Sequence, residues 1–177
     1  MQPKALYNSG FTIVELLIVI VVIGILAAIV IVAFNGVQNR ANETAVKSSL
    51  RDIFTKIQLY HTDEGQGQYP TNQTQLQNLN LKISSGSFDL ANNTFLFCYY
   101  TDHSAAAVLG RVKGTLTPYA YGSAEGLKQM PGWGSSGQER CNIALGESGT
   151  DFTGKAIING TDTSTVPATW RAWTGAS

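Results

Sequence analysis

The first part of the chain is dominated by one long apolar run. No charged residue occurs from Leu16 to Phe34. A helix of roughly 19 residues is about 28 Å long at 1.5 Å per residue, which is close to the hydrocarbon thickness of a bilayer, about 30 Å. The run therefore predicts a membrane-spanning helix. Lys4 precedes it and several basic residues follow it, so the loop charges give no clear orientation.

One carboxylate, Glu15, lies in the opening turn of this run. A charged side chain near the membrane core costs about 2.5 to 3.5 kcal/mol, so such residues usually have a partner. No basic residue follows Glu15 until Arg40. We therefore expect Glu15 to need a cation.

Beyond the run, the apolar residues recur at steps of three and four and predict an amphipathic continuation of the same helix. They are Val46, Leu50, Ile53, Ile57 and Tyr60, and Glu43 stands four residues before Lys47. Asn35-Gly36 is the weak point, because glycine costs about 1 kcal/mol inside a helix, and we expect a kink or a locally melted turn there. The helix should end near His61, before a polar, glycine-bearing segment.

The later part of the chain has β-prone segments in a polar background. Thr94 to Tyr100, Ala105 to Val112 and Pro118 to Tyr121 read as strands. The formal net charge is zero and 14% of the residues are charged, against an average near 25%. This balance gives no sign of a nucleic-acid-binding surface. The abundance of Gly, Ser, Thr, Asn and Gln is typical of a loop-rich exported domain.

A family resemblance lies in the junction between the leader and the apolar run. A short polar leader ending in Gly10, followed by Phe11-Thr12-Ile13-Val14-Glu15, resembles the prepilin signal of type IV pilins and of the pseudopilins of type II secretion and competence systems. The resemblance implies that a prepilin peptidase cuts between Gly10 and Phe11 and that Phe11 is then N-methylated. It also implies that Glu15 pairs with the N-terminal amine of a neighbouring subunit.

The resemblance also implies a domain plan. Residues 1–10 would be the leader, 11–34 the transmembrane and assembly helix, 35–61 its amphipathic continuation and 62–177 the globular head. The fold class is α+β, with a long N-terminal helix packed on a small antiparallel sheet and a loop-rich C-terminal region. Tyr69-Pro70-Thr71 resembles the turn after the long helix in this family, where a short helix with spaced leucines follows.

The two cysteines, Cys98 and Cys141, are an even count in a chain that we expect to be exported, which suggests a disulfide. This pairing resembles the C-terminal loop that many pilins attach to the sheet. Two reduced core thiols are the alternative. Metal binding has less support, because no Cys-x-x-Cys or His pair accompanies them.

Other motifs do not indicate an enzyme. Gly132 to Gly137 fits G-x-G-x-x-G, but it follows Met130-Pro131 and precedes a polar segment, so we assign it to an exposed loop. His61 and His103 have no arrangement typical of catalysis. Asp63, Glu64 and Asp151 leave calcium open, although EF-hand spacing is absent, and we expect no cofactor.

We therefore expect the chain to be a structural pilin of a type IV pilus-like filament. Its partners would be identical or related subunits in a helical homopolymer, the prepilin peptidase, an inner-membrane assembly platform with its ATPase, and membrane lipid before assembly. It would be a single-pass protein of the cell membrane with its head outside the cytoplasm, and then part of an extracellular filament. The alternatives are a pseudopilin of a secretion or competence system and a membrane-tethered binding or adhesion domain. A cleaved secretory signal, a plain anchor and an anchored enzyme are disfavoured.

Overall fold

The computed structural model describes residues 11–83, 86–89, 95–146, 154–158 and 174–176. The chain divides into two compact units, Met1–Gln38 and Asn39–Ser177. The long helix α1, Ile13–Thr62, contributes to both units. Its end at Thr62 confirms the predicted end near His61 to within one residue.

In the first unit, α1 carries apolar side chains on every side. Its large apolar side chains there are about half exposed or more, from Val22 at 48% to Ile13 at 86%. This is the one helix among the described residues that is long and apolar enough to cross a membrane, judged by length and composition. The predicted melted turn at Asn35-Gly36 is wrong, because α1 continues through both residues without interruption. Helix propagation is cooperative, and helical residues on both sides outweigh the cost of one glycine.

In the second unit, α1 is apolar along one side only. Its buried residues are Asn42, Val46, Leu50, Ile53, Phe54 and Ile57, which confirms most of the predicted stripe. Tyr60 is only half-buried. Phe54 was not in the predicted stripe, although it follows Leu50 by four residues. It is fully buried, and its ring lies 5.5 Å from that of Tyr121, measured between centroids.

The partner of this stripe is a five-stranded sheet with the order β5-β4-β3-β2-β6, in which every neighbouring pair is antiparallel. The strands are β2 (Phe95–Tyr100), β3 (Ala106–Arg111), β4 (Pro118–Gly122), β5 (Gly126–Gln129) and β6 (Gly154–Ile158). The three predicted strands match β2, β3 and β4. The antiparallel α+β fold is confirmed.

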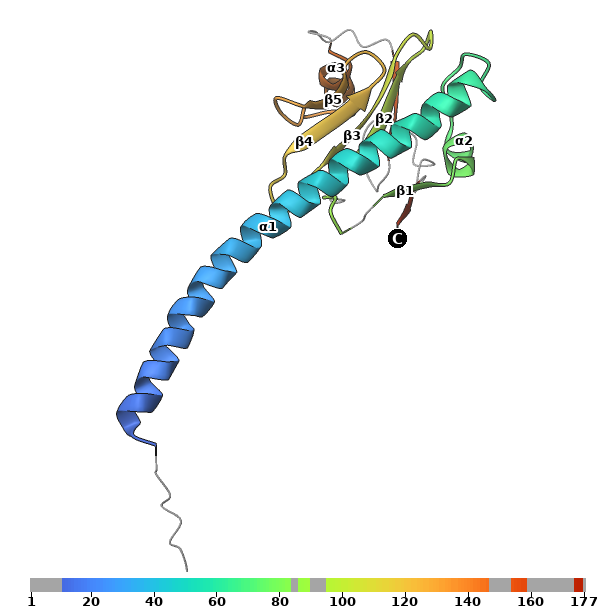
Figure 1. Ribbon diagram of the computed structural model, residues 1–177. Helices are drawn as coiled ribbons and strands as arrows, with labels where there is room; N and C mark the ends of the chain where they lie inside the picture. Colours follow the sequence, from blue (N-terminus) through green and yellow to red (C-terminus); the bar gives the residue numbers. More distant parts are fainter. Residues whose placement is uncertain (1–10, 84–85, 90–94, 147–153, 159–173, 177) are drawn as a thin grey trace, which may run out of the picture. The chain divides into compact units, whose positions relative to one another are not determined.

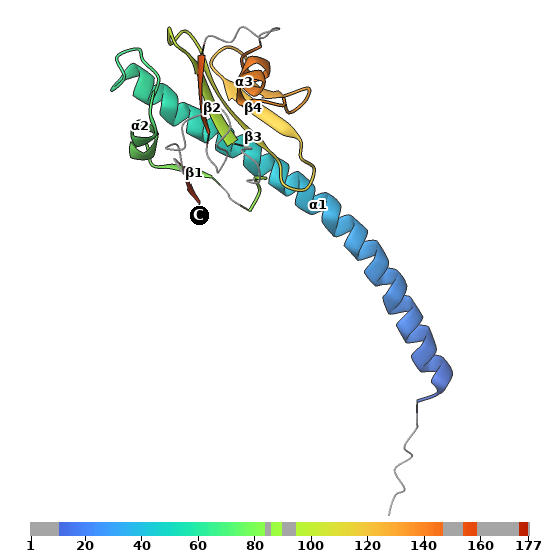
Figure 2. The same ribbon diagram turned by 180° about the vertical axis from the view of Figure 1, so that it is seen from behind.

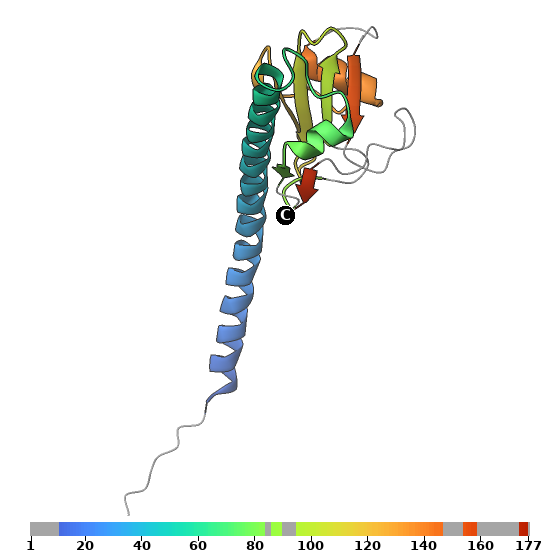
Figure 3. The ribbon, with the colours of Figure 1, turned by 90° about the vertical axis from the view of Figure 1, so that its right-hand side faces the viewer.

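Both faces of this sheet are covered, which explains why β2 reads as a continuous apolar run. Phe95, Phe97 and Tyr99 join the core under α1, while Leu96 and Cys98 join a second core under helix α3 (Gly137–Leu145). Figure 1 shows the second unit from the α1 side and Figure 2 from behind, where α3 lies in front of the sheet. Figure 3 shows the two helices on opposite faces.

Three further elements complete the head. Helix α2, Gln73–Asn78, begins at Asn72, whose side chain accepts a hydrogen bond from the Gln75 N–H. Strand β1, Leu81–Ile83, pairs in parallel with β7, Thr174–Ala176, near the end of the chain. The spaced leucines are divided between these elements, because Leu76 lies in α2 and Leu81 in β1.

The disulfide joins the two sides of the second core. Cys98 in β2 and Cys141 in α3 are bonded across a sequence separation of 43, and both are fully buried. Their Cα atoms lie 5.6 Å apart. The predicted pairing is confirmed, and the alternative of two reduced thiols is wrong. The bond holds α3 against the sheet.

We predict that Cys141→Ser lowers the stability of the head. Closing a loop of this length is worth about 4 kcal/mol on the chain-entropy model, which corresponds to a fall of roughly 10 °C in melting temperature. Differential scanning calorimetry of the detergent-solubilised protein measures the change. Ala144→Ser in α3 is the control, because it places the same hydroxyl in the same core without breaking a covalent bond. Two alkylatable thiols in freshly isolated native protein would contradict the prediction.

Candidate functional site

The start of α1 is closed by a reciprocal pair of hydrogen bonds between Thr12 and Glu15. Glu15 Oε2 accepts from the Thr12 N–H at 2.9 Å and from the Thr12 hydroxyl at 2.7 Å. In return, the Glu15 N–H donates to Thr12 Oγ1 at 3.3 Å. This is a capping box, in which the first turn of a helix satisfies its own N–H groups. Glu15 is therefore a helix cap in addition to any role in pairing.

The capping box also fixes where the carboxylate lies. Its hydrogen bonds bring Glu15 beside Thr12, the residue that follows Phe11. Both side-chain bonds end on Oε2, and Oε1 receives no hydrogen bond from the described residues. Gly10 lies outside the described residues, so the structure does not test the predicted cleavage site. A carboxylate held at a helix start with an unused acceptor atom can bind a cation.

The sequence analysis assigns Glu15 a partner in another molecule and no role in its own helix. The pattern Thr12-x-x-Glu15 immediately before an apolar run is the signature of a capping box. The signal was therefore present in the sequence. Its meaning was obscured because a carboxylate beside a membrane span first suggests a partner in another molecule.

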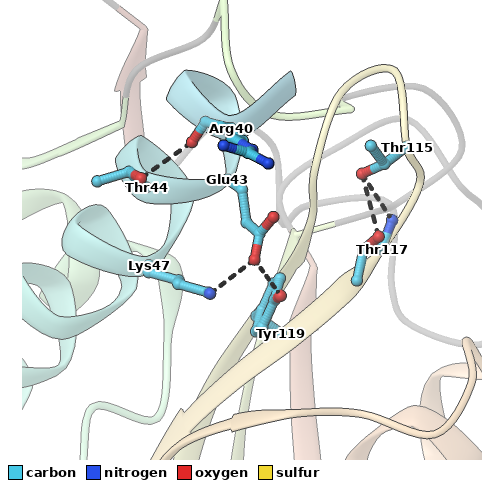
Figure 4. A network of polar contacts seen from close by, with 7 residues as sticks. All are labelled: Arg40, Glu43, Thr44, Lys47, Thr115, Thr117 and Tyr119. Carbon is cyan, nitrogen blue, oxygen red and sulfur yellow. Dashed lines mark hydrogen bonds and ion pairs between the residues drawn. The ribbon is translucent and has the colours of Figure 1, made fainter. Parts of the chain in front are cut away.

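A second polar cluster joins α1 to β4 in the second unit (Figure 4). Glu43 Oε1 accepts from the Tyr119 hydroxyl at 2.6 Å and from Lys47 Nζ at 2.6 Å. Lys47 Nζ also lies 4.6 Å from the centroid of the Tyr119 ring. The expected helical pair of Glu43 and Lys47 is thus present. Tyr119, which the sequence did not connect to them, extends this pair to the sheet.

The ionisation of this cluster follows from its contacts. The hydrogen bond from Lys47, followed by that from Tyr119, lowers the pKa of Glu43. The same bond to Glu43 raises the pKa of Lys47. Burial raises the pKa of Tyr119, and its hydrogen bond to Glu43 raises it further. At neutral pH the cluster is an ion pair with a neutral phenol as second donor, an arrangement that orients α1 on the sheet.

Residues 132–136 of the G-x-G-x-x-G match form a loop, as expected, but Gly134 in this loop is buried. The last glycine of the match, Gly137, is the first residue of α3, whose N-cap is Ser136. Glu139 Oε2 accepts from the Ser135 N–H at 2.6 Å and from its hydroxyl at 2.7 Å. The Glu139 carboxylate therefore ties the loop before α3 to the first turn of that helix.

The histidines lie close to one aromatic residue. The Tyr69 N–H donates to His103 Nδ1 at 2.9 Å, and the rings of His61 and Tyr69 lie 4.2 Å apart between centroids. These contacts attach the segment after α1 to the turn between β2 and β3. Among the described residues no group of three or more His, Cys, Asp or Glu side chains could hold a metal ion. Asp151, one of the calcium candidates, lies outside those residues.

Comparison with known proteins places these features in a family. Residues 6–31 match the family model described as the prokaryotic N-terminal methylation motif. The chain is 36% identical to the type IV wide pilus major component PilA4 of Thermus thermophilus over 108 residues, 61% of this chain and 77% of the relative. It is 39% identical to the type IV major pilin protein PilA of Myxococcus xanthus over 57 residues, 32% of this chain and 26% of that protein. It is 35% identical to the type II secretion system core protein G of Klebsiella michiganensis over 77 residues, 44% of this chain and 53% of that protein.

We predict that Tyr119→Phe lowers the free energy of unfolding by about 1 kcal/mol, because a hydrogen bond to a charged group is lost. Such bonds contribute about 1.5 to 3 kcal/mol, and water screens this one because the Glu43 side chain is 34% exposed. Urea denaturation of the detergent-solubilised protein measures the difference. Tyr121→Phe is the control, because Tyr121 packs its ring on Phe54 two residues further along β4.

The effect of Tyr119→Phe should depend on pH. The lowered pKa of Glu43 means that its contribution to stability is complete above its ordinary value of 4.5 and is lost as the pH falls through the folded value. The raised pKa of Lys47 means that its contribution is complete below 10.5 and is lost as the pH rises through the folded value. The two proteins should therefore differ by a constant amount between about pH 5 and 10 and converge in acid. A pH-independent difference down to pH 2 would contradict the role of Glu43.

Proposed function

The chain belongs to the family of type IV pilins and their relatives in type II secretion, and from this premise we propose that it is a structural subunit of a type IV surface pilus. The observation that carries the proposal is the similarity to a wide pilus major component, of which the chain covers 77%. Pilin-type function and the absence of an enzymatic role follow from the relatives, which are pilins and pseudopilins. The finer assignment to a surface pilus is the proposal.

The domain plan of the proposal follows the apolar pattern. Residues 1–10 are a leader that the prepilin peptidase removes, and Phe11 becomes the methylated N-terminus. Residues 11–34 span the membrane before assembly and pack with other subunits afterwards, residues 35–61 continue the helix, and residues 62–177 form the head outside the cytoplasm. The exposed apolar side chains of the first unit support this plan, because a surface that is apolar on every side of a helix needs lipid or other helices around it.

Glu15 directs assembly in this proposal. Cleavage after Gly10 would create an amine on Phe11, and the same amine on a neighbouring subunit is the cation that Glu15 lacks. The unused Oε1 supports this role, because the capping box occupies Oε2 and leaves an acceptor for a second molecule. A carboxylate that has no cation partner in lipid is costly. If Glu15 can reach the neighbouring amine at only one axial offset between two subunits, the pairing favours that offset.

The second candidate is a pseudopilin of a type II secretion or competence system. The similarity to the core protein G of a type II secretion system favours it, although the chain covers 53% of that protein against 77% of the wide pilus component. An inner-membrane assembly platform with its ATPase would be a partner in either case. Fibres that carry the head on the surface of intact cells would distinguish a pilus from a short pseudopilus.

We predict that the mature chain begins at Phe11. Intact-mass analysis of membrane-extracted protein should show the loss of residues 1–10 and the addition of one methyl group. Gly10→Val is the control, because it should block the cut while it leaves the apolar run unchanged. An uncut N-terminus in a host with an active prepilin peptidase would refute this maturation step.

We predict that Glu15→Val abolishes filaments without affecting insertion or cleavage. Removing the charge makes the span more apolar, so membrane levels should be at least those of the unchanged protein. Antibodies against the head should label fibres on intact cells of the parent strain by electron microscopy and find few or none in the variant.

Glu15→Gln separates the two roles of this residue. Glutamine also closes a capping box, so this variant keeps the helix start and loses only the charge. We expect it to lack filaments as Glu15→Val does. If Glu15→Gln forms fibres in normal numbers, Glu15 acts in assembly as a helix cap, and the charge pairing is wrong.

A further inference from the structure

The turn between β3 and β4, residues 113–117, is seated on the first residues of α1 in the second unit. Asn42 Nδ2 donates to the Lys113 carbonyl at 3.4 Å. Gly114 has a φ of +92°, and a Cβ atom added there would lie 2.9 Å from Asn39 Oδ1. The left-handed φ therefore favours glycine in the turn, and a larger residue there would also displace the Asn39 side chain. Figure 4 shows Thr115 and Thr117 of this turn on the side of α1 that carries Arg40.

The tip of the β3–β4 turn carries an exposed leucine. Leu116 is 49% exposed, and its φ of +58° lies in the left-handed region, which costs a residue with a side chain roughly 1 to 2 kcal/mol. Its N–H donates to the Val112 carbonyl at 2.9 Å, and the Val112 N–H donates to the Thr117 carbonyl at 2.9 Å. The backbone of the turn is thus fixed, and it holds an apolar side chain away from the core. Within the described part of the second unit, only Leu59 is a comparable exposed apolar residue.

The position of the turn along α1 places it close to the end of the apolar segment. Val37 is the last exposed large apolar residue before Asn39 and Asn42. At 1.5 Å per residue, these asparagines follow Val37 by about 3 to 8 Å of helix. The headgroup layer on each side of a bilayer is about 5 to 8 Å thick. The asparagines that contact the β3–β4 turn therefore follow the end of the apolar segment by a length of helix that is no greater than about the thickness of one headgroup layer.

The unpaired charges around the turn are positive, and a layer of anionic headgroups would attract them. Arg40 and Lys113 are exposed and form no ion pair with a described residue. The carboxylates nearby have partners, since Glu43 is bonded to Lys47, and Asp89 lies 3.6 Å from an Arg111 nitrogen. The net charge of the side chains named here is therefore positive. Each basic residue close to an anionic membrane surface contributes about 1 kcal/mol to binding.

We propose that the β3–β4 turn is a second membrane contact of the unassembled subunit, in which Leu116 inserts between lipid headgroups while Lys113 and Arg40 bind lipid phosphates. The inference rests on the proposed membrane-inserted state of the subunit. It explains why a strained leucine is kept at an exposed tip beside two cations. It also gives the head a fixed face toward the bilayer before it joins a filament.

The test uses the full chain reconstituted into vesicles of phosphatidylcholine and phosphatidylglycerol. Leu116→Trp places an indole at the tip, and Leu59→Trp places one at a matched exposed site, 57% exposed, near the far end of α1. The lipids are brominated near the headgroup end of their chains, because bromine quenches indole fluorescence on contact. The unchanged protein gives the background of the native tryptophans.

We expect brominated vesicles to quench the added fluorescence of Leu116→Trp and to leave that of Leu59→Trp at its value in ordinary vesicles. Lys113→Gln in the Leu116→Trp protein should reduce the quenching in vesicles with phosphatidylglycerol and have less effect in phosphatidylcholine alone. Lys82→Gln, an exposed lysine in β1, is the matched control and should have no effect.

Failure of the inference and failure of the proposed function give different results. If the protein does not float with the vesicles, the membrane-inserted state itself is wrong. If it floats and the two added indoles are quenched equally or not at all, the turn does not contact lipid and the inference is overturned. The emission of Leu116→Trp could instead change with the amount of protein per vesicle and be insensitive to bromine. Leu116 would then contact a neighbouring copy of the chain, and this result also overturns the lipid contact.

Discussion

The packing of one apolar stripe of α1 against one face of the sheet is the interaction on which the head depends. Between Val46 and Ile57 the stripe meets β2, β3 and β4 and forms the larger core. From Leu16 to Phe34 the same helix is apolar on every side, and its large apolar side chains are about half exposed or more. The change from all-round to one-sided apolarity, and not a loop, therefore marks the boundary between the two units.

Apolar burial holds this helix in place but does not by itself fix its axial position, because the hydrophobic effect has no direction. The polar contacts supply that direction. In the head, the hydrogen bonds of Glu43 with Tyr119 and of Asn42 with Lys113 are satisfied in one register of α1 only. Glu15 offers the same kind of directional group in a segment that is otherwise free of charge. A few polar atoms thus specify the register of the large apolar surface between α1 and the sheet.

The sequence predicted the features that depend on local pattern. The apolar run, the stripe of α1 and the three central strands can each be recognised from residues that are close together in the sequence. It did not predict β6 or the pairing of β1 with β7, because those contacts join distant segments whose local pattern is weak. Helix α3 was missed because its residues are mostly polar, although Ser136 and Glu139 were readable as an N-terminal cap.

The candidate site was predicted in its composition and only partly in its geometry. Glu15 was singled out by its charge, but its hydrogen bonds to Thr12 were overlooked because the membrane cost of a carboxylate is the larger effect. Tyr119 was not foreseen, since nothing in a short strand shows which helix residue a phenol will reach. The disulfide gives the head a further property: disulfides form and persist in oxidising compartments, so in the proposed topology the bond closes once the head lies outside the cytoplasm. A chain crosslinked across 43 residues can no longer thread a narrow channel as a single extended strand. In the proposed topology, closing the bond between Cys98 and Cys141 therefore prevents the head from returning through such a channel as an extended strand.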